Sequence, residues 1–323
     1  MNDPRAACRT IDRMIRFSGA FTAIVTPFTA DGTRVDLVRL EQQVQFQARG
    51  GVRGIVPCGT TGEAPTLSEA EHESVVACAV RTGKPLGLQI VAGAGSNSTA
   101  HAIHLHRLAH KLGADASLQV SPYYNKPSQE GLYRHFMSIA DSCPLPIMLY
   151  NIPGRAAVTI TPETVARLSA HPNIVAIKEA TGSMDSASDI RRRCDIAILS
   201  GDDSLTASFA AVGAEGVVSV VSNLVPSRVA ALCAAITAGS LHDMRRMHDA
   251  LYPLARGLLS LDVNPVPLKT AMQVLGRDSG AVRLPLAPAS DAARGEIERL
   301  LHAADLHASD PQALRASAVE AAT

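Results

Sequence analysis

Residues 172–182 have the sequence PNIVAIKEATG, a short apolar run that ends on Lys178. Four apolar residues, two of them isoleucine and one valine, are typical of a short buried strand in a parallel sheet. An ammonium group at the end of such a strand is costly unless it is paired, opens to a cavity or loses its proton. Lys178 therefore has two interpretations, a nucleophile or one partner of an ion pair with a nearby carboxylate.

Seven further short apolar runs recur along the chain, and the segments between them have helical signatures. Ser68 to Glu71 form a capping box, and Thr161-Pro162 places proline at a first helical position. Eight strands that alternate with helices predict an α/β fold, the (β/α)8 or TIM barrel, which needs about 250 residues. The expected strands are residues 20–25, 54–57, 86–92, 116–120, 147–150, 174–178, 196–200 and 216–221.

The barrel is expected in residues 18–239, and its last helix at about 226–238. Residues 240–306 indicate three further helices, interrupted at Asn264-Pro265-Val266-Pro267 and around 283–288, which we assign to a small C-terminal helical domain. Residues 1–17 would form an N-terminal extension, and the alanine-rich residues 307–323 a flexible tail.

Composition argues for a soluble enzyme or binding protein. The 323 residues include 30 basic and 30 acidic side chains without a basic block, which argues against nucleic acid or a charged membrane surface. No apolar run approaches the ~20 residues of a membrane span, and the N-terminus lacks the apolar core of a signal peptide. Six cysteines without a C-x-x-C pair fit the reducing cytoplasm.

Reactive residues follow the expected strands at their C-terminal ends, where barrel enzymes do their chemistry. Thr60 and Thr61, flanked by glycines, offer donors for a small carboxylate, although this motif alone could be a turn. Tyr150 can pass protons, and Arg155 can bind a carboxylate through two N–H groups. Together with the amine of Lys178, these groups predict a site for carbonyl chemistry.

Other chemistries are disfavoured. Gly93-Ala94-Gly95 lacks the third glycine of a dinucleotide fingerprint. His101, His104, His106 and His110 lie on one expected helix, split between two faces without an interleaved cysteine or aspartate, so we expect no metal site.

Six motifs, taken together, resemble the dihydrodipicolinate synthase / N-acetylneuraminate lyase family over residues 18–304. Within the family they are most similar to the branch that condenses pyruvate with aspartate semialdehyde in the diaminopimelate route to lysine. The motifs are residues 59–63 (GTTGE), 123–127 (YYNKP), 150–155 (YNIPGR), 177–182 (IKEATG), 201–203 (GDD) and 264–269 (NPVPLK).

The resemblance implies a role for each matching residue. Lys178 would form a Schiff base with pyruvate, and Tyr150 would act as general acid and base. Thr61 would link Tyr150 to Tyr124 in a proton relay, with Tyr124 supplied by a neighbouring subunit. Thr60 and Thr61 would hold the pyruvate carboxylate.

Substrate choice and assembly are implied in the same way. Arg155 would bind the carboxylate of the semialdehyde, while backbone carbonyls of Gly201 and Val218 would line the pocket. The family uses no metal or organic cofactor and is usually a homotetramer, a dimer of dimers. Two alternatives stay open: a pyruvate-dependent aldolase or lyase of a 2-keto-3-deoxy sugar acid, and a non-catalytic barrel that binds a keto acid.

Feedback by lysine is a further expectation from the resemblance. His101 stands where lysine-inhibited members have a glutamate, and Glu69 stands where they have a histidine. An imidazole offers no fixed negative charge to the amino group of lysine, so we expect weak inhibition or none. The matching cleft positions are Ala64, Pro65, Glu69, His72, Asn97, His101 and Tyr123.

Overall fold

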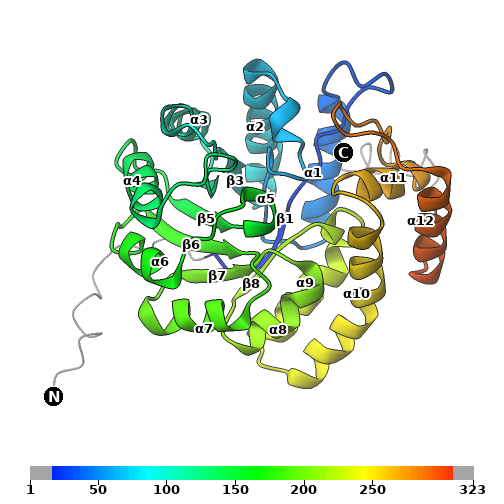
Figure 1. The fold of residues 1–323 in the computed structure, drawn as a ribbon. Helices are drawn as coiled ribbons and strands as arrows, with labels where there is room; N and C mark the ends of the chain where they lie inside the picture. Colours follow the sequence, from blue (N-terminus) through cyan, green and yellow to red (C-terminus); the bar gives the residue numbers. More distant parts are fainter. Residues whose placement is uncertain (1–16, 308–323) are drawn as a thin grey trace.

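A closed barrel of eight parallel strands forms the centre of the molecule, in a computed structural model that describes residues 17–307 (Figure 1). Each strand pairs with the next along the chain, and β8 pairs with β1. The predicted (β/α)8 barrel is thus confirmed. The strands are β1 (Gly19–Thr22), β2 (Gly54–Ile55), β3 (Gln89–Gly93), β4 (Ala116–Val120), β5 (Ile147–Asn151), β6 (Ile174–Glu179), β7 (Ala197–Ser200) and β8 (Gly216–Ser219).

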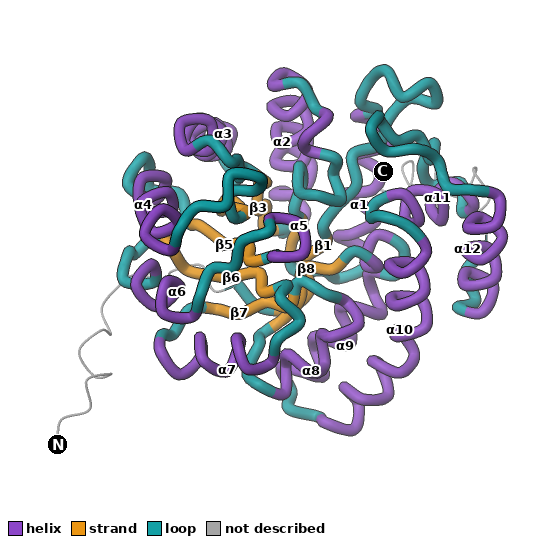
Figure 2. Tube along the Cα trace, viewed as in Figure 1, coloured by secondary structure: helices purple, strands orange, loops and turns teal. Residues whose placement is uncertain are grey.

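Helices surround the strands on the outside of the barrel (Figure 2). The predicted capping box is present at the start of α2, where Ser68 Oγ accepts from the Glu71 N–H and the Glu71 carboxylate accepts from the Ser68 N–H. The barrel helices are α1 (Leu37–Arg49), α2 (Glu69–Gly83), α3 (Thr99–Leu112), α4 (Gln129–Ala140), α5 (Pro153–Ala156), α6 (Pro162–Leu168), α7 (Met184–Arg193), α8 (Thr206–Ala211) and α9 (Pro226–Thr237).

Most strand bounds differ from the prediction by one to three residues, and two of these differences have a clear local reason. The strand expected at 86–92 begins only at Gln89, because Lys84–Leu86 form a 3-10 turn that Gly87 ends with φ +79°. The strand expected at 216–221 ends at Ser219, because the chain turns into a second 3-10 segment, Val221–Asn223. Apolar composition alone does not distinguish these turns from strand.

Large apolar side chains pack inside the barrel. Phe17, the last residue of the expected extension, is fully buried and packs against Phe21 with ring centroids 5.8 Å apart. Leu118, Met148 and Leu199 belong to the same cluster. The interior is therefore a packed core, and space for a substrate is left toward the C-terminal ends of the strands.

Three helices follow the barrel, as expected for residues 240–306, and cover one side of it (Figure 1). They are α10 (Leu241–Leu261), α11 (Val266–Val274) and α12 (Asp291–Ala303). Lys269 on α11 forms a buried ion pair with Glu63 of the β2–α2 loop. Arg283 pairs with Glu71 of α2, and this contact lowers the pKa of the Glu71 carboxyl to about 2. The added helices thus hold the loop that follows β2.

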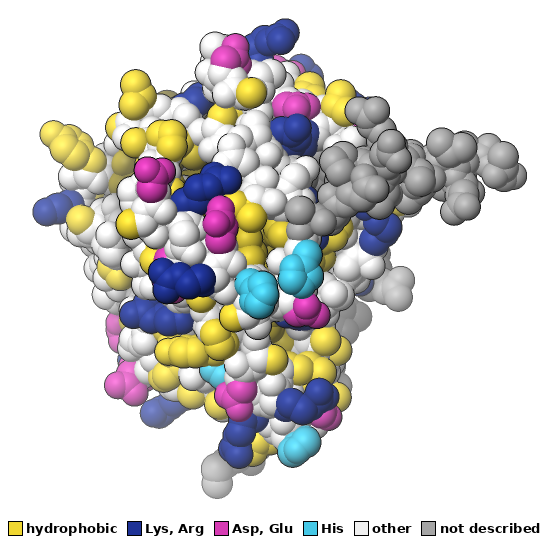
Figure 3. Space-filling view, turned by 90° about the vertical axis from the view of Figure 1, so that its right-hand side faces the viewer, with side chains coloured by type: hydrophobic (Ala, Val, Ile, Leu, Met, Phe, Trp, Pro, Cys, Tyr) yellow, Lys and Arg dark blue, Asp and Glu magenta, His cyan; other side chains and the backbone are white. Residues whose placement is uncertain are grey.

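The surface gives no sign of one dominant charge on the side seen in Figure 3, where basic and acidic side chains are interspersed. Within residues 17–307, no helix is long and apolar enough to cross a membrane. The remaining residues of the expected extension and tail lie outside the described part of the chain.

Candidate active site

Lys178 and Tyr150 stand directly opposite each other in the pairing of β6 with β5. Partners in a sheet point to the same face, and this face is the barrel interior, where Lys178 is 5% and Tyr150 4% exposed. The Lys178 Nζ atom lies 4.1 Å from the centroid of the Tyr150 ring. Within the described residues no carboxylate lies within 4.0 Å of this amine, so the ion-pair interpretation of Lys178 finds no partner there.

Asn151 and Glu179 are the next residues of β5 and β6, and their side chains point away from the barrel interior. They hold the ends of the two strands together. Glu179 is paired with Asn151 in the sheet register. Its carboxylate accepts from Asn151 Nδ2 at 3.1 Å and from the Thr181 N–H at 2.9 Å, and burial raises its pKa. These bonds tie together the ends of β5 and β6, on which the amine and the phenol are carried.

Gly201 follows the end of β7 and lies beside Lys178. A Cβ atom at this position would lie 3.2 Å from Cε of Lys178 and 2.6 Å from Cβ of Ala180. Glycine therefore leaves room for the lysine side chain.

The end of β8 is fixed by a buried aspartate. Val218 is buried in the barrel interior, in the same cluster as Tyr150. Asp203 accepts from Ser219 Oγ at 2.5 Å and from the Val220 N–H at 2.8 Å, and burial raises the pKa of its carboxyl. The motif 201–203 thus determines where the chain leaves both strands.

The threonine pair lies on the β2–α2 loop. Thr61 is buried, and its Oγ1 accepts a hydrogen bond from Nδ2 of Asn264 at 3.0 Å. Arg155, on the short helix α5 after β5, is exposed at the rim, and its Nη2 donates to the backbone carbonyl of Asn264 at 3.4 Å. Asn264 was not among the predicted site residues, although it belongs to the motif 264–269.

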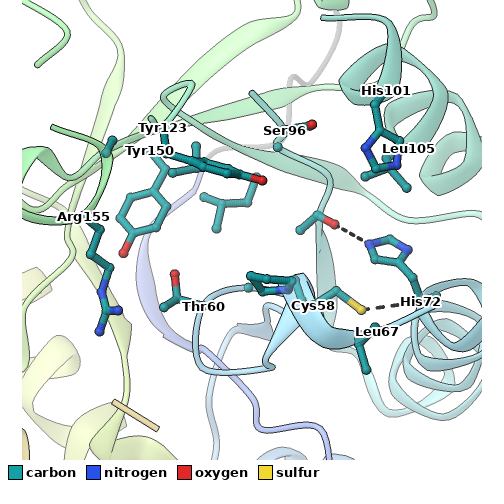
Figure 4. A pocket seen from close by; sticks show the side chains of 18 of the residues that line it. Cys58, Thr60, Leu67, His72, Ser96, His101, Leu105, Tyr123, Tyr150 and Arg155 are labelled. Atoms are coloured by element: carbon teal, nitrogen blue, oxygen red, sulfur yellow. Dashed lines mark hydrogen bonds between the residues drawn. The ribbon is translucent and has the colours of Figure 1, made fainter. Parts of the chain in front are cut away.

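A cavity of about 540 Å³ is lined by Thr60, Tyr150 and Arg155 and extends to a second group of polar side chains, while Lys178 and Thr61 lie outside its lining. In Figure 4, Thr60, Tyr150 and Arg155 lie at one end, and His72, His101 and Leu105 at the other. The lining residues therefore include members of both the predicted substrate site and the predicted lysine cleft. The cleft positions among them are Ala64, Pro65, Glu69, His72, His101 and Tyr123.

Several polar side chains at and near the second end already have partners within the chain. His72 is buried and its Nε2 donates to the Gly93 carbonyl at 2.8 Å, while burial lowers the pKa of its imidazole. The Glu69 carboxylate contacts Nε2 of His104 on α3. Asn97 Nδ2 donates to the backbone carbonyl of Tyr123.

The remaining histidines of α3 do not converge. His106 is buried against Ser117 at 2.8 Å, whereas His101 and His104 stack on each other near the surface. Across residues 17–307, no three His, Cys, Asp or Glu side chains are grouped so that they could hold a metal ion.

Tyr124 is the predicted site residue that the single chain leaves exposed to solvent, away from the barrel interior. Its side chain is 89% exposed and its backbone has φ +75°, a left-handed conformation unusual for tyrosine. The other predicted residues gather at the C-terminal mouth of the barrel, around an amine suited to forming a Schiff base.

The fold and this site are those of a Schiff-base-forming barrel enzyme, and comparison with known proteins agrees. The profile of the Dihydrodipicolinate synthetase family matches residues 16–304. The chain belongs to this family and is a lyase.

Individual relatives cover nearly the whole chain. The 4-hydroxy-tetrahydrodipicolinate synthase of Geotalea daltonii is 49% identical over 283 residues, 87% of this chain and 96% of the relative. The solved structure of the enzyme of the same name from Methylacidiphilum fumariolicum SolV is 47% identical, with a TM-score of 0.87, over 90% of this chain and 96% of that one. A lysine-bound structure from Cyanidioschyzon merolae is 38% identical, with a TM-score of 0.87, over 90% and 99%.

Proposed function

We propose that the chain acts as a 4-hydroxy-tetrahydrodipicolinate synthase, which condenses pyruvate with L-aspartate 4-semialdehyde through a Schiff base on Lys178. The observation that carries this proposal is the amine of Lys178, buried beside the Tyr150 ring with no carboxylate partner among the described residues. The amine attacks a ketone in its unprotonated form, and among the described residues no neighbouring carboxylate favours the protonated form. The identity with synthases of this name over most of the chain supports the same reaction.

The chemistry begins when the Lys178 nitrogen adds to the ketone carbon of pyruvate and water leaves, which forms a Schiff base. Loss of a proton from the neighbouring methyl carbon gives an enamine. The enamine carbon then adds to the aldehyde of the second substrate, whose oxygen takes up a proton while the imine to Lys178 forms again. The amino group of the semialdehyde can then add to the imine carbon and displace the Lys178 amine, which closes the ring and frees the enzyme. Tyr150 lies next to the amine and would deliver and remove the protons that these steps require.

Proton exchange with solvent would run from Tyr150 through Thr61 to Tyr124. Because Tyr124 is exposed in the single chain, we propose that it enters the site of a neighbouring subunit in a homotetramer, a dimer of dimers. The hydroxyl groups of Thr60 and Thr61 and the carbonyls of Gly201 and Val218 would hold pyruvate.

Arg155 would select the second substrate. Its guanidinium lies at the rim of the cavity, where it could bind the compact carboxylate of the semialdehyde through two hydrogen bonds. A longer sugar acid presents hydroxyl groups to this region instead. We further propose that the enzyme works in the cytoplasm. It would need no metal or organic cofactor, since the Schiff base itself stabilises the carbanion.

The decisive assay compares two second substrates. Product formation from pyruvate with aspartate semialdehyde is measured beside pyruvate with N-acetylmannosamine. We expect turnover with the semialdehyde only. Turnover with the sugar alone would replace the synthase by a sugar-acid lyase, and absence of any pyruvate imine would indicate a binding protein.

A further inference from the structure

Asn264 approaches the active site from outside the barrel. It lies between α10 and α11, in the connection that also contains Pro265. Its side-chain Nδ2 donates to Thr61 Oγ1 at 3.0 Å, and its backbone carbonyl accepts from Arg155 Nη2 at 3.4 Å. One residue of the added helices thus contacts both a proposed relay residue and the proposed carboxylate-binding residue.

The direction of the bond to Thr61 has a chemical consequence. A threonine hydroxyl has a single proton and two lone pairs. Because Asn264 Nδ2 donates to Oγ1, it occupies a lone pair and leaves the Thr61 proton to be given to another acceptor. A hydroxyl that passes a proton between Tyr150 and Tyr124 must be free to donate its own proton to one of them. An acceptor in place of Nδ2 would instead capture the Thr61 proton.

The loop that carries Thr61 has independent supports, so the amide of Asn264 is not needed to hold the loop in place. Thr26 Oγ1 donates to the Gly62 carbonyl at 2.7 Å. Glu63, whose φ is +52°, is held by Lys269 Nζ at 2.7 Å and by the Arg283 N–H at 3.0 Å. The bond from Asn264 is therefore suited to orienting the hydroxyl.

We propose that Asn264 is a positioning residue for the reaction, which orients the Thr61 hydroxyl for proton transfer and braces Arg155 through its backbone. This inference rests on the proposed function, because it assigns Asn264 a task in the relay of that reaction. It extends the active site to the C-terminal helices. It also gives the carboxamide a role that an aspartate of the same shape could not fill.

A double-mutant cycle tests the proposal. The variants are Asn264→Ala, Thr61→Val and the double variant, with Val263→Ala, an exposed neighbour, as the control. Asn264→Ala is expected to lower kcat about tenfold, the effect of one hydrogen bond of ~1.4 kcal/mol. The KM values for both substrates should change less than twofold, since alanine keeps the carbonyl that braces Arg155.

The second arm of the cycle separates positioning from structure. In the Thr61→Val background, Asn264→Ala should change kcat less than twofold, because no hydroxyl remains to be oriented. If the two losses multiply instead, Asn264 acts independently of Thr61 and the proposal is wrong. Asn264→Asp, which can only accept, should be at least as slow as alanine despite its equal size. Recovery of full activity by aspartate would also refute the proposal.

Failure of the proposed function can be told apart from failure of this inference. The double-mutant cycle can also be measured without the semialdehyde, by comparing the initial rates at which the four proteins are trapped by borohydride with pyruvate. If the unaltered enzyme forms no product but traps pyruvate, the synthase assignment fails while the cycle still tests Asn264. Thermal unfolding of each variant is measured, and Asn264→Ser serves as a milder substitution. If neither alanine nor serine gives a folded protein, the residue is structural and the proposal is overturned.

Discussion

The buried ion pair between Lys269 and Glu63 joins the C-terminal helices to the β2–α2 loop. Lys269 Nζ lies 2.7 Å from Glu63 Oε1, and both side chains are fully buried. The same amine donates to the Thr26 carbonyl at 3.0 Å and lies 4.1 Å from the centroid of the Phe28 ring. Replacing Lys269 by methionine keeps an unbranched side chain that lacks the terminal amine, and it leaves the Glu63 carboxylate buried with one remaining bond, from the Arg283 N–H.

The expected loss of stability for Lys269→Met is about 3–5 kcal/mol, the usual cost of removing one partner from a buried pair. The matched control is Lys84→Met. Lys84 pairs with Asp115 at 2.9 Å, but it is largely exposed, so its loss should cost no more than about 1 kcal/mol.

Denaturant unfolding at pH 7, at a fixed protein concentration because assembly adds to stability, gives both values. The double variant Lys269→Met with Glu63→Gln should regain part of the loss, since no unpaired charge remains buried. Equal effects of Lys269→Met and Lys84→Met would refute the argument that the helices hold the loop through this pair.

Three further predictions concern substrates, assembly and feedback. Arg155→Ala should lower kcat/KM for the semialdehyde tenfold or more, from a charge-assisted contact of about 1.5–3 kcal/mol, while pyruvate trapping stays nearly intact; an equal fall in trapping would make Arg155 a scaffold residue. Inactive Tyr124→Phe and Lys178→Ala chains should regain activity when co-assembled, because mixed pairs contain one complete site, and confirmed assembly without recovery would place Tyr124 outside a shared site. Millimolar lysine should inhibit weakly or not at all, since Glu69 is engaged by His104, and His101→Glu should increase sensitivity; inhibition of the unaltered enzyme at micromolar lysine would contradict this reasoning.

Local patterns were enough to predict the barrel and to place several polar residues at one mouth of it. Each strand is a short apolar run, and strand ends of a parallel barrel meet at one mouth, so Lys178, Tyr150 and Arg155 could be placed together before any coordinates. Boundaries failed where a turn interrupts an apolar run, as at Gly87, whose left-handed backbone ends a 3-10 segment.

Contacts between distant segments could not be predicted in this way. Asn264 reaches Thr61 across 203 residues of sequence, and Lys269 reaches Glu63 across 206. Both contacts depend on how the C-terminal helices pack against the barrel, which no local periodicity encodes. The pairing of Glu69 with His104 likewise depends on the packing of α2 beside α3. For Tyr124, the predicted partners belong to another chain.

The central claim is that Lys178 is the Schiff-base nucleophile, and trapping with pyruvate tests it most directly. The enzyme is treated with pyruvate and borohydride, digested, and its peptides are analysed by mass spectrometry. A single reduced adduct is expected on the peptide that contains Lys178, and Lys178→Ala and Lys178→Arg should both abolish it, because arginine stays protonated. An adduct on Lys126 or Lys269, or no adduct at all, would contradict the mechanism.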